Sequence, residues 1–162
     1  MSVIAVLSGL SFSRDVSFSN EVVIARPVAE VYAFLADFEN MPKWNYYLRS
    51  VKRISAGPLA VGTAFHQVRK SDEQDYKITE LDSNSIAVET LPPYRKLQMR
   101  FEFHQERAST RVVDTWLIRV PFFLSPFIKH NVRNGVAANL EKLKVLLENG
   151  QVVLQDGRME KL

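Results

Sequence analysis

The feature that most constrains this fold is a long amphipathic segment, from about Pro126 to Asn149, that follows a run of alternating strands. Its apolar residues recur at three- and four-residue steps, which predicts one stripe along a helix of more than about five turns. The stripe comprises Phe127, Ile128, Val132, Val136, Leu140, Leu143 and Leu147. Only the preceding strands offer an apolar face to cover it, so we expect the helix to lie across a curved antiparallel sheet.

This arrangement predicts a cavity. A long helix cannot touch a curved sheet along its whole length, and the gap between them is a candidate pocket. A void costs about 24 cal/mol per Å³, and ligand sites usually occupy ~300 to 1,000 Å³. An unfilled void of that size would forfeit several kcal/mol of stability, so we expect one to be retained only where it binds something.

Length and composition limit the class of protein. The chain has 162 residues, 46% hydrophobic and 24% charged, which fits one globular domain that buries roughly 70% of its unfolded surface. Cysteine is absent, which excludes disulfides and thiolate chemistry and permits a reducing compartment, so we expect a cytoplasmic protein. The net charge is +3 and the basic residues are scattered, whereas a nucleic-acid surface would cluster them among aromatics. We therefore expect no nucleic-acid partner.

The chain divides into three parts. Residues 1–15 are interpreted as an N-terminal tail or extra edge segment, 16–149 as the folded domain, and 150–162 as a loose C-terminal tail of mixed polarity. No Lys or Arg precedes the apolar run at residues 1–12, and the run is short of the ~20 residues of a membrane helix. A signal peptide is the alternative left open, because Ser8 and Gly9 are small residues of the kind found at cleavage sites.

Periodicity predicts the order of elements. A first strand from about Val16 ends at Arg26-Pro27, a helix follows from Pro27 to about Phe38, and a short second helix is expected at Asn40 to Tyr47, with Trp44 plugging one end of the core. Short connections then predict antiparallel hairpins. The six further strands are expected at Leu48–Ser55, Thr63–Lys70, Gln74–Leu81, Ser85–Leu91, Lys96–Gln105 and Ser109–Val120.

Short motifs in a fixed order carry a resemblance to a known family. They are Val22 to Tyr32 (VVIARPVAEVY), Trp44 with Val51, Val61-Gly62-Thr63, and Thr110-Arg111-Val112. From about Val16 to Asn149 the chain resembles the START-like superfamily, also called SRPBCC, and most closely its polyketide cyclase/dehydrase and lipid-transport branch. The resemblance implies an α+β helix-grip fold, with a curved antiparallel sheet of about seven strands packed on a long C-terminal helix in the order β-α-α-β-β-β-β-β-β-α. Members include ligand carriers, hormone receptors, cyclases and lipid-transfer proteins, so the fold does not fix the function.

The last two strands are expected to supply an apolar, aromatic inner wall. On one strand Val112, Asp114, Trp116, Ile118 and Val120 share a face, and on its neighbour Leu97, Met99, Phe101 and Phe103 do so. A carboxylate on such a wall must be hydrogen-bonded, paired, or raised in pKa. Asp114 is therefore either a polar anchor, or general acid or base, for a ligand, or an Asp at a twist or bulge paired with Arg or Tyr from an adjacent strand.

Other titratable candidates are less constrained. The facing of strands Thr63–Lys70 and Gln74–Leu81 is left open, so His66 and Tyr76 point either inward or outward. His104 shares a face with charged residues and is expected to be exposed. His66, His104 and His130 match no metal-binding spacing. We expect no metal and no cofactor.

The long helix adds further candidates. Gly135 costs about 1 kcal/mol relative to Ala, which suggests a close approach to the sheet or a place where ligand replaces a side chain. Asn131 and Asn139 lie near the stripe and offer amides, and Tyr46 and Asn45 are candidates for the rim. The candidate ligand-binding set is Trp44, His66, Tyr76, Met99, Phe101, Phe103, Asp114, Trp116, Phe127, Asn131, Gly135 and Asn139.

A second surface is predicted at the segment Pro121 to His130 (PFFLSPFIKH). Its aromatics Phe122, Phe123 and Phe127, followed by Lys129 and Arg133, are typical of a pocket mouth or a transient membrane contact. The alternative is that they are simply buried in the first turn of the long helix.

No nucleophile elbow, zinc-protease motif, phosphate loop or dinucleotide fingerprint occurs in the sequence. The favoured hypothesis is a carrier or binding protein for a small hydrophobic molecule, lipid-, polyketide- or aromatic-like. One alternative is a cyclase- or dehydratase-like enzyme that moves protons with Asp114, His66 or Tyr76. Another is a membrane-associated lipid or quinone carrier, or a chaperone-like partner of the same fold; a homodimer is left open.

Overall fold

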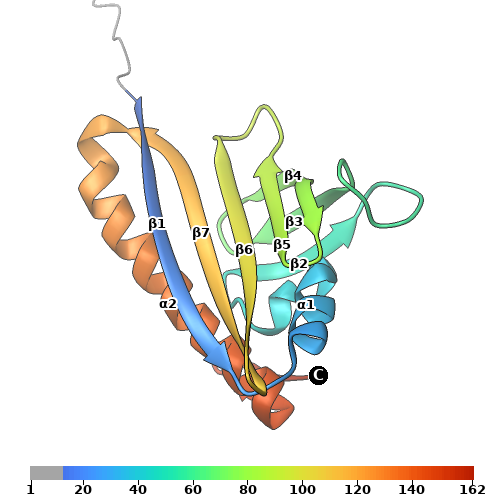
Figure 1. Cartoon of the computed structure of the whole chain (residues 1–162). Helices are drawn as coiled ribbons and strands as arrows, with labels where there is room; N and C mark the ends of the chain where they lie inside the picture. The colour runs from blue at the N-terminus through green and yellow to red at the C-terminus, as the bar shows by residue number, and fades with distance from the viewer. Residues whose placement is uncertain (1–12) are drawn as a thin grey trace, which may run out of the picture.

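The fold is a seven-stranded antiparallel sheet held against one long helix (Figure 1). A computed structural model describes residues 13–162, and the predicted N-terminal segment lies outside the described residues except for Ser13–Asp15, which open the first strand. The strand order is β1-β7-β6-β5-β4-β3-β2. The strands are β1 (Ser13–Ile24), β2 (Leu48–Arg53), β3 (Ala64–Arg69), β4 (Glu73–Asp82), β5 (Ser85–Thr90), β6 (Leu97–Glu106) and β7 (Ser109–Pro121).

The sheet confirms the predicted fold class. Each strand from β2 to β6 pairs antiparallel with the strand that follows it. β1 pairs antiparallel with β7, from Ser13 opposite Pro121 to Ile24 opposite Thr110, and forms one edge of the sheet. Short connections leave consecutive strands no alternative but to pair with each other. The first strand instead pairs with the last strand of the sheet, β7, along its whole length.

The connection between β1 and β2 carries α1 (Val28–Ala36) and a short 3-10 helix, η1 (Phe38–Lys43). The predicted second helix at Asn40 to Tyr47 is therefore wrong in its bounds. Pro42 lies inside η1, and proline supplies no backbone N–H, so a tighter and shorter helix forms there. Trp44 follows it and is buried, with its ring edge-on to Phe101, which is the end-plugging position that the sequence suggests.

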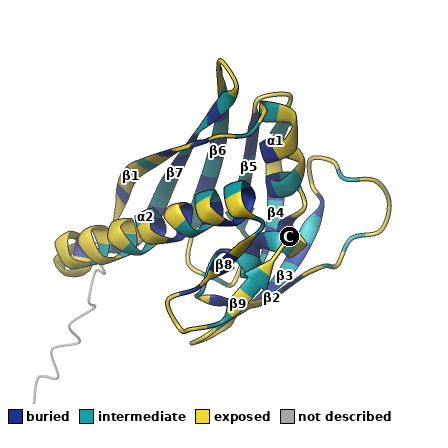
Figure 2. Ribbon diagram, turned by 90° about the horizontal axis from the view of Figure 1, so that it is seen from below, coloured by how far each residue is buried: buried dark blue, intermediate teal, exposed yellow. Residues whose placement is uncertain are grey.

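The long helix α2 (Ser125–Asn149) is buried along only part of its length (Figure 2). Val136, Leu140, Leu143 and Leu147 are buried as predicted, and Leu146 joins them. Between Pro126 and Gly135 no residue is fully buried. Phe127, the first member of the predicted stripe, is 70% exposed, so the stripe is wrong at its start. The C-terminal half of the helix is packed in the core. The N-terminal half is only partly buried: Ile128 and Val132 pack against the core, and Arg133 O accepts a hydrogen bond from Asn20 of β1 at 3.3 Å.

The C-terminal segment also differs from the predicted loose tail. After α2 ends at Gly150, which has φ +75°, the chain forms a small hairpin from β8 (Gln151–Val153) and β9 (Met159–Lys161). Val152 and Leu154 are buried, and the hairpin loop is joined to the sheet by an ion pair of Lys70 with Asp156 at 2.8 Å. Two apolar side chains in a polar stretch are enough to anchor it.

Candidate functional site

A cavity of about 300 Å³ lies between the middle of α2, from Asn131 to Asn139, and the inner face of the sheet. Its volume is at the lower end of the range of ligand sites. The apolar part of its lining comes from both layers: Met41, Leu48, Val88, Leu97, Met99 and Trp116 on one side, and Val132 and Val136 of α2 on the other. The cavity thus lies between the long helix and the sheet and has a largely apolar lining, as the sequence predicts.

Two side chains from the helical segment between β1 and β2 confine the cavity to one half of the sheet: Tyr32 of α1 and Trp44, which follows η1. The ring of Tyr32 packs edge-on against Phe103 with centroids 5.2 Å apart, and Trp44 packs against Phe101 at 6.4 Å. These contacts fill the inner face at the end where β6 finishes. The opposite end, around Met99 and Trp116, has no such cover and remains open toward α2.

The cavity brings together half of the candidate set. Tyr76, Met99, Trp116, Asn131, Gly135 and Asn139 line it. The other six lie elsewhere: Trp44, His66, Phe101, Phe103, Asp114 and Phe127. Phe101 and Phe103 face inward as expected, but they are covered by Trp44 and Tyr32, and Phe127 points to solvent. The sequence identified the correct face of the sheet without revealing which part of that face is already filled.

His66 lies on the outer face of the sheet. Phe65 and Gln67 beside it are buried, so strand alternation turns the imidazole outward. There its Nδ1 lies 2.7 Å from an oxygen of Asp75, which is the facing residue on β4. A cavity role for His66 is therefore wrong. Within residues 13–162, no three His, Asp or Glu side chains are grouped as metal ligands.

Asp114 is buried beside the cavity without lining it. Its side chain is 1% exposed, its Oδ2 accepts a hydrogen bond from Trp116 Nε1 at 2.8 Å, and its Oδ1 has no partner among the described residues. Burial raises the pKa of this carboxyl to about 7, against which the Trp116 hydrogen bond lowers it only in part. The pairing of β7 with β1 and β6 runs without a register shift there, so neither a bulge nor an Arg or Tyr partner accounts for it. Its one side-chain contact is this hydrogen bond with Trp116, which does line the cavity.

Tyr76 is the one candidate for acid or base chemistry that reaches the cavity. It is 3% exposed, and its hydroxyl donates a weak hydrogen bond to Met41 Sδ at 4.0 Å. Burial raises the pKa of this phenol above its usual value near 10. The hydroxyl therefore stays protonated and acts as a hydrogen-bond donor.

Gly135 marks a close approach, but to a tyrosine ring rather than to the sheet. A Cβ at this position would lie 3.0 Å from the hydroxyl of Tyr47, which reaches over α2 from the start of β2. Tyr47 packs on Tyr46 with centroids 4.0 Å apart, and the Lys70 ammonium lies 4.3 Å from the Tyr46 ring. This stack forms the rim of the cavity, and the missing side chain of Gly135 lets it sit against the helix.

Asn139 joins three segments of the chain beside the cavity. Its Nδ2 donates to Asn45 Oδ1 at 3.0 Å, and its Oδ1 accepts from Gln155 Nε2 at 3.2 Å. The sequence analysis suggests this amide as a group that bonds to a ligand. In the structure it instead connects α2, the loop before β2 and the hairpin loop. Asn131, by contrast, is exposed at the mouth.

The sequence interpretation missed several lining residues, and two buried glutamines are the most notable among them. Gln67 and Gln74 are 8% and 7% exposed, and both line the cavity. The signal for them was present, because Phe65 and Tyr76 are the large apolar residues of their strands and every second residue shares a face. The phase of these strands was left open, so the glutamines were not assigned inward.

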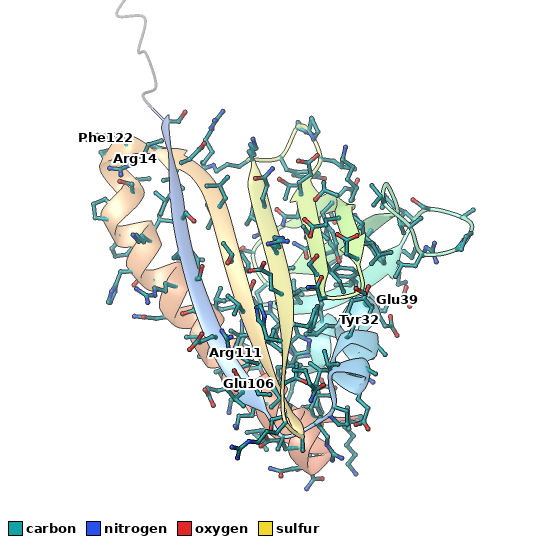
Figure 3. All side chains as sticks on the ribbon, viewed as in Figure 1. Arg14, Tyr32, Glu39, Glu106, Arg111 and Phe122 are labelled. Carbon is teal, nitrogen blue, oxygen red and sulfur yellow. The ribbon has the colours of Figure 1, made fainter. Side chains whose placement is uncertain are left out.

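The start of α2 carries a separate exposed aromatic patch. Phe122 and Phe123 in the short 3-10 helix η2 (Phe122–Leu124), together with Phe127, are 59%, 78% and 70% exposed. Arg14 of β1 lies over the ring of Phe122 at 5.8 Å (Figure 3). The alternative in which these rings are buried in the first turn of the helix is therefore wrong. No helix in the described part of the chain is both long and apolar enough to cross a membrane.

Comparison with known proteins agrees with this architecture. A family model described as polyketide cyclase/dehydrase and lipid transport matches residues 15–148. Among solved structures, a START superfamily protein from Mycobacterium smegmatis is similar with a TM-score of 0.71 at 14% sequence identity, over 82% of this chain and 97% of that one. A search of curated protein sequences gives no match. The resemblance stated from the sequence motifs is confirmed at the level of family and fold.

Proposed function

The chain belongs to the polyketide cyclase/dehydrase and lipid-transport family, and on that premise we propose that it binds a small hydrophobic molecule between α2 and the sheet, as a carrier or binding protein. The observation that carries the proposal is the cavity of about 300 Å³ between the sheet and the middle of α2, where Asn131, Val132, Gly135, Val136 and Asn139 face it. A void of that size costs several kcal/mol when unfilled, at about 24 cal/mol per Å³. Lipid-, polyketide- and aromatic-like molecules all suit its apolar lining.

The residues around the cavity favour a carrier over an enzyme. Of the three candidates for proton transfer, His66 lies on the outer face, Asp114 does not line the cavity, and the Tyr76 hydroxyl stays protonated. A cyclase or dehydratase that works by positioning a reactive ligand is the alternative on the same scaffold. Turnover of polyketide-like substrates by the purified protein would favour that alternative.

A cavity-filling variant tests the proposal. Val136→Phe places a ring in the cavity from α2, whereas Val145→Phe makes the same change at an exposed position on the same helix. We expect naphthalene, followed by ligand-observed NMR, to bind the wild type and Val145→Phe alike and Val136→Phe at least about tenfold more weakly. Native mass spectrometry of freshly purified protein should show a co-purifying apolar molecule that Val136→Phe lacks. Equal naphthalene binding by all three proteins would contradict the proposal.

The exposed aromatic patch favours a membrane-associated lipid or quinone carrier as the second candidate. Phe122, Phe123 and Phe127 stand beside the basic residues Arg14 and Lys129, a combination that suits an anionic membrane surface. Phe127 precedes Asn131 at the cavity mouth by four residues, so both lie on one side of α2. A molecule that left a bilayer at the patch would therefore be next to the opening of the cavity at Asn131.

Liposome flotation tests this second candidate. We expect the protein to float with vesicles containing phosphatidylserine, and the variant Phe122→Ser/Phe123→Ser to stay in solution. Val153→Ser is the matched control, because Val153 is 49% exposed on the hairpin. Light scattering tests the alternative, in which a second copy of the chain covers the patch in a homodimer. If the wild type does not float and is dimeric, the patch is a subunit contact.

A further inference from the structure

Two glutamine amides face the cavity without partners. Gln67 on β3 and Gln74 on β4 are directly opposite each other in the antiparallel register, which places their Cβ atoms about 4.5–5.5 Å apart. Both side chains are more than nine-tenths buried and line the cavity. Neither amide hydrogen-bonds to another group within residues 13–162, although the neighbouring His66 and Arg69 side chains are paired with Asp75 and Asp72. They form a paired polar site where β3 and β4 face the cavity.

The charged groups of the cavity lining are already neutralised. The only charged lining residues within the described part of the chain are Arg69 and Lys70. Arg69 makes two hydrogen bonds to the carboxylate of Asp72, at 2.5 and 2.6 Å, and Lys70 pairs with Asp156 at 2.8 Å. A bidentate arginine–carboxylate pair satisfies both members. The lining therefore presents no unpaired charge to an anionic or cationic group.

The remaining polar groups are neutral and mostly engaged. Asn139 is held by Asn45 and Gln155, and the hydroxyl of Thr90 bonds to the backbone of Arg95 and Leu97. A molecule that fills the cavity removes the two glutamine amides from water. It must then bond to them, because a buried amide left without a partner loses the hydrogen bonds that it made to water.

From this division we infer that the cavity selects an uncharged molecule with a carbonyl or hydroxyl oxygen, which the amides of Gln67 and Gln74 hold. The inference rests on the proposed function and adds the class of ligand. An amide NH₂ donates to a carbonyl oxygen, and its C=O accepts from a hydroxyl. Carboxylates and phosphates are disfavoured, because they would have to leave water without meeting an unpaired cation. The volume, equal to about ten water molecules at roughly 30 Å³ each, restricts the molecule to a small one.

Four matched probes test the inference on the wild-type protein. Naphthalene has no polar group, 2-acetylnaphthalene adds a carbonyl, 2-naphthol adds a hydroxyl, and 2-naphthoate at pH 8 carries a full negative charge. We expect competition measured by ligand-observed NMR to rank at least one of the two neutral oxygen compounds about tenfold or more above naphthalene. We expect 2-naphthoate to bind more weakly than both neutral oxygen compounds. Which of the two binds best reports whether the amides act mainly as donors or as acceptors.

The double variant Gln67→Leu/Gln74→Leu isolates the amides. Leucine keeps nearly the same volume, so the variant should bind naphthalene within about threefold of the wild type and lose the preference for the oxygen compounds. Gln98→Leu is the control, because Gln98 lies on the outer face of β6 and bonds to Glu89. If the double variant does not fold, as judged by its thermal unfolding, the two single variants should each reduce the preference.

The outcomes separate this inference from the proposed function. Tightest binding of 2-naphthoate, or equal binding of all four probes, overturns the neutral-ligand inference while cavity binding stands. A preference for oxygen compounds that persists in the folded leucine variants overturns the assignment to Gln67 and Gln74. If naphthalene and its derivatives fail to bind the wild type at all, both the inference and the proposed function are overturned.

Discussion

At the scale of single residues, Asp114 has an unusual environment for a carboxyl group. Its carboxyl is almost completely buried with one hydrogen bond, from Trp116, and burial raises its pKa to about 7. In an unfolded chain the same group titrates near 3.8. Folding therefore holds a proton on this side chain over a pH range in which the unfolded chain releases it.

This difference in pKa predicts a fall in stability with rising pH. Between about pH 4 and 7 the unfolded state binds fewer protons at Asp114 than the folded state, so the free energy of unfolding decreases as pH rises and levels off above the folded pKa. A separation of roughly three pH units corresponds to on the order of 4 kcal/mol. We expect Asp114→Asn, which cannot titrate, to lack this decrease.

Urea unfolding of the wild type and Asp114→Asn from pH 4 to 8 measures how the free energy of unfolding changes with pH. The carboxyls whose pKa is lowered by ion pairs, Asp15, Glu80 and Asp156, act in the opposite direction, but both proteins share them. The wild-type minus variant difference therefore reports Asp114 alone. Parallel stability curves across this range would show that its pKa is not raised. Altered naphthalene binding by the variant would instead indicate a polar-anchor role.

Residue-level prediction from the sequence succeeded where alternation was unambiguous. Met99 faces inward as predicted, because β6 alternates cleanly between apolar and polar residues. Asp114 and Trp116 share the inner face of β7 with buried Val112 and Val120, also as predicted. On β3, Phe65 and His66 are both plausible inward residues, so the phase could not be fixed. The structure resolves it in favour of Phe65 and thereby brings Gln67 inside.

At the scale of elements, α2 combines two different roles. Its C-terminal half packs against β1 and the hairpin, and Leu140 and Leu143 are no more than 1% exposed. Its N-terminal half contributes Val132 and Gly135 to the cavity and leaves Phe127 in solvent. The amphipathic pattern runs through both halves, because a cavity lining and a packed core require the same apolar residues. Periodicity alone could not locate the transition.

Two truncations in α2 should have very different effects. Leu143→Ala removes a fully buried side chain and is expected to lower the free energy of unfolding by about 2–5 kcal/mol. Phe127→Ala removes a ring that is 70% exposed and is expected to change it by no more than about 0.5 kcal/mol. Chemical unfolding measures both. A large loss from Phe127→Ala would mean that the ring is covered in solution.

At the scale of the whole molecule, the fold was predictable because the order of elements is restrictive. One strand, a helical connection, six hairpin-linked strands and a long helix permit few arrangements in which every apolar face is covered. The hairpin β8–β9 was not predicted, since its only apolar anchors are Val152 and Leu154 and its polar anchors, such as Lys70 with Asp156, come from distant segments. The extent of the cavity was not predictable either, because it depends on where Tyr32 and Trp44 come to rest.

Ligand binding should stabilise the whole molecule. A molecule that binds only the folded state at a hundredfold excess over its Kd adds about 2.7 kcal/mol. We expect 2-acetylnaphthalene at that concentration to raise the Tm of the wild type by several degrees and to leave Val136→Phe unchanged. Differential scanning calorimetry measures both. An equal rise in the two proteins would place the binding outside the cavity.

The hydrogen bonds of Asn139 to Asn45 and Gln155 connect three segments that are far apart along the chain. Asn45 precedes β2, Asn139 belongs to α2, and Gln155 follows β8. Asn45 and Asn139 line the cavity, whereas Gln155 does not. The C-terminal hairpin is therefore expected to keep this part of the cavity wall ordered without contacting a bound molecule.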